Sequence, residues 1–231
     1  AMELAYPPFE TKDDAGNPSG VSVDFMKDFG AAYGYDVVIE NTAFDGLIPM
    51  VQTGKADCLM SSITITEARK ESVDFSDPYY YASIVCLVKS DGAYADATGI
   101  SSFEGATATS QLGTVWYDTC LPQIENANIL PAQETAPAML VALDSGACDV
   151  VVTDMPTAMA ACAAYPNFKL LDFTGTDDDF EVSEEEVNIG ISVRKGNTQL
   201  LDALNEALSP MTADDFTTMM DEAIRIQPLN G

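Results

Sequence analysis

The sequence predicts an α/β protein with two similar lobes that face a cleft. Segments with apolar residues at helical spacing alternate along the chain with short apolar runs typical of buried strands. In addition, one pattern occurs twice, because residues 47–62 and 139–154 each contain an apolar helix, a glycine, an aspartate, an apolar strand and a polar pair. Ligands of open α/β folds bind beyond strand ends, so two such units favour a cleft lined by both. Helix–glycine–strand units are common, and a chance repeat is the alternative.

The composition is that of a globular protein with a strongly acidic surface. Of the 231 residues, 47% are hydrophobic, and 37 Asp and Glu against 10 Lys and Arg give a net charge of −27. Such a surface repels nucleic acid and anionic membranes, so we expect no nucleic-acid partner. The chain has no histidine, which excludes histidine bases, Ser-His-Asp triads and histidine metal sites.

Five cysteines form no recognisable metal or redox motif. No pair has C-x-x-C spacing, so neither a zinc site nor a thioredoxin-like site is predicted, and we expect no metal and no cofactor. The spacing leaves room for one disulfide without assigning its pairing. The cysteines are Cys58, Cys86, Cys120, Cys148 and Cys162.

Targeting segments give no information about location. No stretch approaches the ~18 apolar residues of a transmembrane helix, and no signal peptide is visible. The chain begins abruptly at Ala1-Met2-Glu3-Leu4, as though a leader and part of a first strand had been removed.

Each element of the first half follows from a local pattern. Two prolines stiffen the first turn, apolar residues recur at helical spacing before Gly34 and Gly54, and β-branched runs indicate strands. In chain order we expect a turn at 6–10, a helix at 24–34, a strand at 36–40, a helix at 47–51, a strand at 57–60, a strand and turn at 73–78 and a buried strand at 84–88.

The second half begins with a change of composition. Residues 91–105 are rich in Gly, Ala, Ser and Asp, which indicates a linker or the entry to a second domain. Residues 176–186 form an acidic loop, most simply a solvated surface. The elements expected are a strand at 106–111, a turn at 113–116, a helix at 136–143, a strand at 149–152, a helix opening at 153–156, strands at 168–171 and 188–193, and helices at 199–208 and 214–224.

Residues 58–69 have the features of a carboxylate receptor. A short apolar strand ends in hydroxyl residues, and Thr66 can cap a new helix. Arg69 then lies about one turn into that helix, with Ser62 and Thr64 just upstream. A guanidinium beside two hydroxyls and a helix N-terminus suits a carboxylate. The alternative is a strand–loop–helix junction with a surface arginine.

Eight motifs in order resemble those of the polar amino-acid-binding proteins of bacterial ABC importers (solute-binding protein family 3). Each motif alone is weak, but the ordered combination is specific and covers nearly the whole chain. The motifs are Tyr6-Pro-Pro-Phe-Glu10, Ala43-Phe-Asp-Gly-Leu-Ile-Pro49, Ser61-Ser-Ile-Thr-Ile-Thr-Glu-Ala-Arg-Lys70, Val73-Asp-Phe-Ser-Asp-Pro-Tyr-Tyr80, Gln111-Leu-Gly-Thr-Val115, Leu143-Asp-Ser-Gly-Ala-Cys-Asp-Val150, Asp154-Met-Pro156 and the stretch 190–195.

This resemblance implies a hinged, two-lobed α/β fold of the periplasmic-binding-protein type II class. Lobe 1 would comprise residues 1–88 and 187–231, and lobe 2 residues 89–186. Two crossing strands, near Leu87–Lys89 and Val187–Ile189, would form a hinge about which the lobes close on a ligand. The composition change at residue 91 agrees with this division.

The resemblance also implies ligand contacts in lobe 1. Arg69 matches the arginine that binds the ligand α-carboxylate, and Ser62 and Thr64 match partners of the same ligand backbone. Tyr6 and Phe44 match walls of the side-chain pocket, with core packing as the alternative.

In lobe 2, Thr114 and the backbone N–H of Val115 match contacts to the carboxylate. Asp154 matches the acid that binds the α-ammonium; its alternative role is an N-cap before Met155-Pro156, and both roles can hold. Trp116, beside Val115, is a less certain match.

Two residues bear on which amino acid would bind. Glu3 matches a position that can contact the ligand side chain, although a solvent-exposed Glu3 is the alternative. An acid there, with Gln111 in the same region, favours a polar neutral or cationic ligand and disfavours an acidic one.

The resemblance thus predicts a monomeric binding protein, not an enzyme, that delivers a free amino acid to the permease subunits of an ABC transporter. It would act outside the cytoplasm, in the periplasm or at the cell surface as a lipoprotein. One alternative is a cyclohexadienyl dehydratase-like enzyme, for which only Glu3, Asp154 or a tyrosine could serve as acid or base. The other is the ligand-sensing domain of a membrane receptor.

Overall fold

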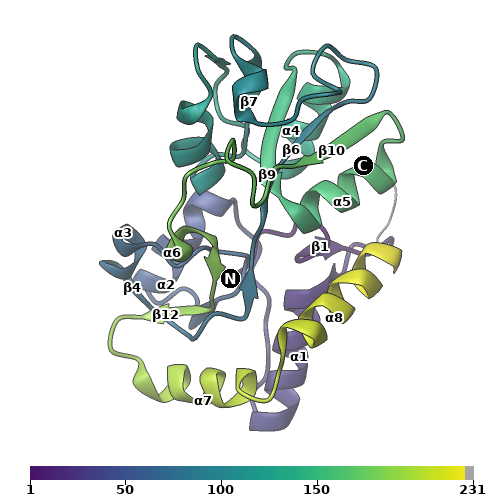
Figure 1. Cartoon of the computed structure of the whole chain (residues 1–231). Helices are drawn as coiled ribbons and strands as arrows, with labels where there is room; N and C mark the ends of the chain where they lie inside the picture. Colours follow the sequence, from purple (N-terminus) through teal and green to yellow (C-terminus); the bar gives the residue numbers. More distant parts are fainter. Residues whose placement is uncertain (227–231) are drawn as a thin grey trace. The chain divides into compact units, whose positions relative to one another are not determined.

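A computed structural model describes residues 1–226, which fold into two compact α/β units. Of the described residues, unit 1 comprises 1–81 and 184–226, and unit 2 comprises 82–183. The chain therefore passes between the units a few residues before the predicted limits of 88–89 and 186–187. Both units mix helices and strands (Figure 1), as the α/β class requires. Within residues 1–226, no helix is both long and apolar enough to cross a membrane.

The described residues of unit 1 form three small sheets. The largest has order β3-β12-β4, and its central strand β12 is antiparallel to both neighbours. The others pair β1 with β2 and β5 with β11, both antiparallel. The strands are β1 (Thr11–Lys12), β2 (Pro18–Ser19), β3 (Cys58–Leu59), β4 (Val73–Phe75), β5 (Tyr80–Tyr81), β11 (Asn188–Ile189) and β12 (Ser192–Arg194).

The single strand predicted at 188–193 is two short strands. Between β11 and β12 the backbone leaves the sheets, because the Gly190 N–H donates to the Ile63 carbonyl (3.1 Å) and the Ile191 N–H donates to the Ser76 hydroxyl (2.9 Å). A Cβ at Gly190 would lie 2.8 Å from Cδ1 of Ile65, so a larger residue there would require the Ile65 side chain to shift.

Helices surround these sheets and bury their apolar faces. Helix α1 ends at Gly34, which adopts the left-handed conformation with φ 77°. It begins three residues before the predicted Asp24, directly after Gly20. Helices α7 and α8 pack against α1 (Figure 1). The helices of unit 1 are α1 (Val21–Tyr33), α2 (Leu47–Gln52), α3 (Glu67–Lys70), α6 (Glu184–Val187), α7 (Thr198–Leu208) and α8 (Ala213–Ile226), with a 3₁₀ turn η1 (Phe44–Gly46) before α2.

The strand predicted at 36–40 is wrong: in the described structure this segment forms none. Strand-like hydrogen bonds occur only at the end of this segment. There the Met2 N–H donates to the Glu40 carbonyl (3.0 Å), and the Thr42 N–H donates to the Met2 carbonyl (3.1 Å). Val38 is 76% exposed. A β-branched run forms a strand only when another strand lies alongside it, and pattern alone does not reveal the partner.

Unit 2 is built on one five-stranded sheet of order β10-β6-β9-β7-β8. Strand β6 is antiparallel to β10 and β9, whereas β7 is parallel to β9 and β8. Strands β6 and β9 are almost wholly buried, as expected of continuous apolar runs. The strands are β6 (Ile84–Lys89), β7 (Thr107–Thr109), β8 (Asn128–Ile129), β9 (Val150–Asp154) and β10 (Phe168–Asp172).

Helices α4 (Ala136–Asp144) and α5 (Met155–Ala164) pack on this sheet. The 3₁₀ turns η2 (Ile100–Phe103) and η4 (Leu121–Gln123) and the π-helical turn η3 (Trp116–Cys120) lie in its connections.

The acidic segment 176–186 is more than a solvated surface. The Asp178 carboxylate accepts a hydrogen bond from the Ser101 N–H (3.1 Å), and its carbonyl accepts one from the Ile100 N–H (3.0 Å). This segment therefore anchors the start of η2, and its last residues begin helix α6.

Candidate functional site

Arg69 is held in a fixed position at the start of α3. Thr66 caps this helix, as predicted, because its hydroxyl accepts a hydrogen bond from the Arg69 N–H (3.3 Å). One guanidinium nitrogen, Nη1, donates to the Thr64 carbonyl (2.9 Å) and also to the Thr64 hydroxyl. The guanidinium carbon lies 5.6 Å from the centre of the Phe44 ring. A cation beside an aromatic face gains electrostatic stabilisation, so Phe44 and Thr64 together orient the charge.

Ser62 lies just upstream, with its hydroxyl directed at a buried acid. It is a non-glycine residue in the left-handed region, with φ 51°. Such backbone conformations cost about 1–3 kcal/mol and occur preferentially at ligand sites. Its hydroxyl donates to both carboxylate oxygens of Glu10, at 3.3 Å each.

Glu10 is a functional candidate that the sequence reasoning missed. It is completely buried and also accepts a hydrogen bond from the Ser22 hydroxyl. The pKa of the neighbouring Tyr79 phenol is raised far above its ordinary value, first by burial and then by the negative charge of Glu10. The signal available was the position of Glu10 at the end of the Tyr6–Glu10 motif. Its serine partners are distant in sequence and could not be deduced.

The remaining predicted residues of unit 1 are also buried. Glu3 is 2% exposed, so the solvent-exposed alternative is wrong, and its backbone N–H donates to the Ser61 hydroxyl (2.9 Å). Tyr6 is buried and stacks on Phe9, with ring centres 6.2 Å apart.

In unit 2, Asp154 lies at the end of β9 and begins α5. Its carboxylate accepts a hydrogen bond from the Thr157 N–H (2.9 Å), so the predicted N-cap is present. Asp154 is 1% exposed. Because β7 and β9 are parallel neighbours, the turn that follows β7 and the end of β9 lie at the same edge of the sheet.

That turn carries the other predicted residues of unit 2. The Thr114 hydroxyl donates to the Gln111 carbonyl (2.8 Å) and accepts from the Tyr117 N–H (3.3 Å). Gln111 is fully buried, and Val115 and Trp116 are 7% and 4% exposed. The structure thus gathers Gln111, Thr114, Val115 and Asp154 at one sheet edge, and Ser62, Thr64, Arg69 and Phe44 around one turn of unit 1.

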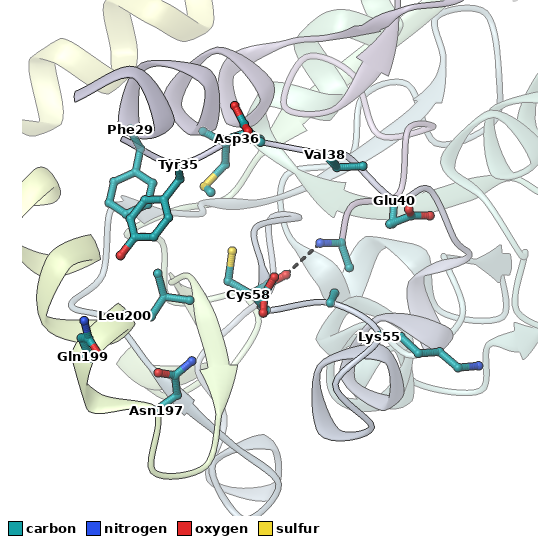
Figure 2. Close-up of a pocket in the computed structure, with 15 residues that line it drawn as sticks. Phe29, Tyr35, Asp36, Val38, Glu40, Lys55, Cys58, Asn197, Gln199 and Leu200 are labelled. Carbon is teal, nitrogen blue, oxygen red and sulfur yellow. Dashed lines mark hydrogen bonds between the residues drawn. The ribbon is translucent and has the colours of Figure 1, made fainter. Parts of the chain in front are cut away.

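A cavity of about 600 Å³ in unit 1 is separate from these residues. Its lining is mixed: the stacked rings of Phe29 and Tyr35 lie beside charged side chains such as Lys55 (Figure 2). At its edge the backbone nitrogen of Ala1 donates a hydrogen bond to the Cys58 carbonyl (2.8 Å). None of the predicted ligand contacts lines this cavity.

The structure gives the state of the five cysteines and the arrangement of the acidic side chains. All five cysteines lie within the described residues, and none of them forms a disulfide. In the described part of the chain, no cluster of three or more Cys, Asp or Glu residues is arranged to hold a metal ion.

Residues 1–222 match the model of the bacterial extracellular solute-binding proteins, family 3. The chain belongs to this family. The predicted family is therefore confirmed, over nearly the whole length on which the motifs were matched.

Curated relatives of this family member are named as amino-acid-binding proteins. A probable histidine-binding protein of Neisseria gonorrhoeae is 32% identical over 90% of this chain and 75% of its own length. The L-arginine-binding protein of Pseudomonas aeruginosa is 30% identical over 92% of this chain and 82% of its own length.

Solved structures confirm the predicted fold class. The arginine-bound form of truncated ArgBP from T. maritima superposes with a TM-score of 0.80 at 32% identity and covers 91% of this chain and 94% of its own. The ancestral amino-acid-binding protein AncCDT-1, described as a precursor of cyclohexadienyl dehydratase, has a TM-score of 0.82 at 32% identity and covers 96% of this chain and 93% of its own.

Proposed function

We propose that this family member is the substrate-binding protein of an ABC importer and binds a free amino acid through its α-carboxylate and α-ammonium groups. The observation that carries the proposal is the fixed guanidinium of Arg69, held by Thr64 and beside Phe44. The names of the relatives, which include histidine- and arginine-binding proteins, support the same ligand class.

The electrostatics of a zwitterion explain why two opposite charges are needed. An amino acid loses a large hydration energy when it is buried, unless each of its charges meets a partner. Arg69 supplies the positive partner from unit 1, and Asp154 supplies the negative partner from unit 2. We propose that both act on one ligand, so that the ligand stabilises the closed arrangement of the lobes through contacts made only there.

We further propose a polar neutral or cationic side chain on the ligand. Glu3 and Gln111 are both buried, and a buried acid favours a ligand with hydrogen-bond donors at its tip. Apart from Arg69, the proposed contacts include no cation that would attract an acidic side chain. The arginine-binding relatives agree with a cationic ligand.

A thermal-shift screen against free amino acids tests the proposal. A ligand present at ~100 times its dissociation constant adds roughly 2.7 kcal/mol of stability and raises the melting temperature. We expect arginine, lysine, ornithine or glutamine to raise it most, and glutamate least. If no free amino acid shifts the melting temperature of the folded protein, the proposed function is wrong.

The family description, extracellular solute-binding proteins, supports a location outside the cytoplasm. We propose that the protein acts there as a monomer, either in the periplasm or anchored as a lipoprotein, and delivers its ligand to permease subunits. Sedimentation of the purified protein and mass spectrometry of the protein isolated from its native membrane test the two parts of this proposal. A stable dimer contradicts the first part, and the absence of lipid excludes the anchor.

The resemblance to AncCDT-1 makes an enzyme the second candidate. A turnover assay with prephenate and arogenate separates the two. Formation of phenylpyruvate or phenylalanine would contradict a role restricted to binding.

A further inference from the structure

A buried carboxylate lies directly behind one of the proposed ligand contacts. Glu10 is 0% exposed, and Ser62, in front of it, is 8% exposed. The Ser62 hydroxyl donates to both oxygens of this carboxylate, and the Ser22 hydroxyl donates to one of them. A buried acid is costly unless its oxygens receive hydrogen bonds, which these two hydroxyls provide.

Three separate segments hold this cluster in place. Glu10 closes a tight turn, because its N–H donates to the Tyr6 carbonyl (3.0 Å) and the Tyr6 N–H donates to the Glu10 carbonyl (2.9 Å). Ser22 lies in the first turn of α1, where its N–H donates to the Phe9 carbonyl (3.0 Å). Ser62 is fixed by its left-handed backbone. The fold therefore sets the backbone positions of all three residues, and the hydrogen bonds to Glu10 direct the Ser62 hydroxyl.

The direction of that hydroxyl decides what Ser62 can bind. A serine hydroxyl has one hydrogen to donate and two lone pairs to accept hydrogen bonds. Because Glu10 accepts the hydrogen, the Ser62 oxygen offers only its lone pairs to other groups. The neighbouring Tyr79 phenol also interacts with the Ser62 side chain and can occupy one lone pair, which leaves one for a ligand. The Ser62 oxygen can then accept a hydrogen bond from an ammonium but cannot donate one to a carboxylate.

The charge of Glu10 acts in the same direction. Interactions between charges are stronger where protein rather than water surrounds them. The neighbouring Tyr79 phenol stays neutral, since burial and the charge of Glu10 raise its pKa far above the ordinary value. An ionised Glu10 carboxylate makes the region around Ser62 attractive to cations and repulsive to anions.

We propose that Glu10 is a positioning residue that makes the Ser62 hydroxyl an obligatory acceptor and so assigns it to the α-ammonium of the ligand, while Arg69 and Thr64 take the α-carboxylate. This inference rests on the proposed amino-acid-binding function. It adds to that function a residue that does not contact the ligand itself. This residue determines which charged group of the zwitterion Ser62 contacts.

The test compares ligands with and without the α-ammonium. One pair of probes is L-arginine and 5-guanidinopentanoic acid, which is arginine without its α-ammonium. The other pair is L-glutamine and glutaramic acid, which is glutamine without its α-ammonium. Calorimetry is carried out with the pair whose amino acid binds to the wild type. The variant Glu10→Gln is nearly isosteric, but its amide can donate to Ser62. It should weaken binding of the amino acid about 10- to 100-fold, as for the loss of a hydrogen bond to a charged group, and change binding of the analogue less than threefold.

Further variants keep the inference falsifiable. Glu71→Gln removes the same charge from an exposed position in unit 1, and it should change neither dissociation constant. If Glu10→Gln fails to fold, Ser62→Ala provides the test, because it should weaken the amino acid but not the analogue. The double variant should bind no more weakly than Ser62→Ala alone, because Glu10 is proposed to act only through Ser62.

Two kinds of failure are distinguishable. Equal weakening of the amino acid and its analogue, or unchanged binding of both by Glu10→Gln, overturns the role of Glu10 and leaves the proposed function intact. A wild type that binds no amino acid overturns both proposals.

Discussion

Asp154 caps helix α5 and is also proposed to bind the ligand ammonium, and one substitution separates the two roles. Asparagine caps helices about as well as aspartate, whereas alanine at the cap costs about 1 kcal/mol. We therefore expect Asp154→Asn to keep most of the unfolding free energy but to weaken amino-acid binding strongly. Denaturant unfolding and calorimetry on Asp154→Asn, Asp154→Ala and the exposed control Asp144→Asn provide the measurements. Near-native affinity in Asp154→Asn would remove Asp154 from the ligand site.

At the scale of single residues, contacts between residues close in sequence could be predicted, whereas contacts between distant residues could not. The hydroxyls before Arg69 and the capping Thr66 are within a few residues of one another, so spacing predicted their proximity. Glu10 meets Ser22 and Ser62 across 12 and 52 residues of chain. Neither the burial of this acid nor the conformation of Ser62 has a signature in the sequence, and the cluster became visible only in three dimensions.

At the scale of the elements, the turn before α1 contains a crowded glycine with a positive φ. Gly20 has φ 111°, and a Cβ there would lie 2.5 Å from the Phe9 carbonyl oxygen and 2.8 Å from that of Pro8. Gly16 also has a positive φ, of 84°, but a Cβ there would meet no atom within 4 Å. The two glycines therefore form a matched pair that differs in crowding.

We expect Gly16→Ala to lower the unfolding free energy by about 1–2 kcal/mol, the cost of a left-handed alanine. Gly20→Ala should lower the unfolding free energy by a further ~1–3 kcal/mol, because the added methyl group overpacks the turn. It should also shift the turn that carries Glu10. Urea unfolding of both variants measures the difference. Equal losses would mean that the turn yields easily and does not fix the carboxylate.

Helices were predicted better than short strands because a helix satisfies its own backbone. Helix α4 was expected at 136–143 and spans Ala136–Asp144, and α7 was expected at 199–208 and spans Thr198–Leu208. A strand depends on partners that the local pattern does not identify. This dependence explains both the missing strand at 36–40 and the division of 188–193 into β11 and β12.

On the scale of the whole molecule, the ordered motifs predicted family and fold correctly. The residues at which one lobe ends and the other begins were harder to predict from the sequence. The apolar run of β6 shows that it is buried, but not which sheet receives it, and its residues join the sheet of unit 2. The hinge strands near 87–89 and 187–189 stay a prediction. The net charge did not identify the ligand, because an acidic surface is compatible with many ligands.

The central claim is that one arginine in this acidic protein binds the carboxylate of a free amino acid. Calorimetric titration of Arg69→Ala, with the amino acid that most stabilises the wild type, tests it most directly. The neighbouring Lys70→Ala is the matched control, because Lys70 lies in the same helical turn and pairs with Glu67 at the surface, 2.8 Å away.

We predict that Arg69→Ala loses about 2–5 kcal/mol of binding free energy, since the ligand carboxylate would be buried without its partner. Lys70→Ala should bind like the wild type. A folded Arg69→Ala protein that binds with near-native affinity would contradict the claim.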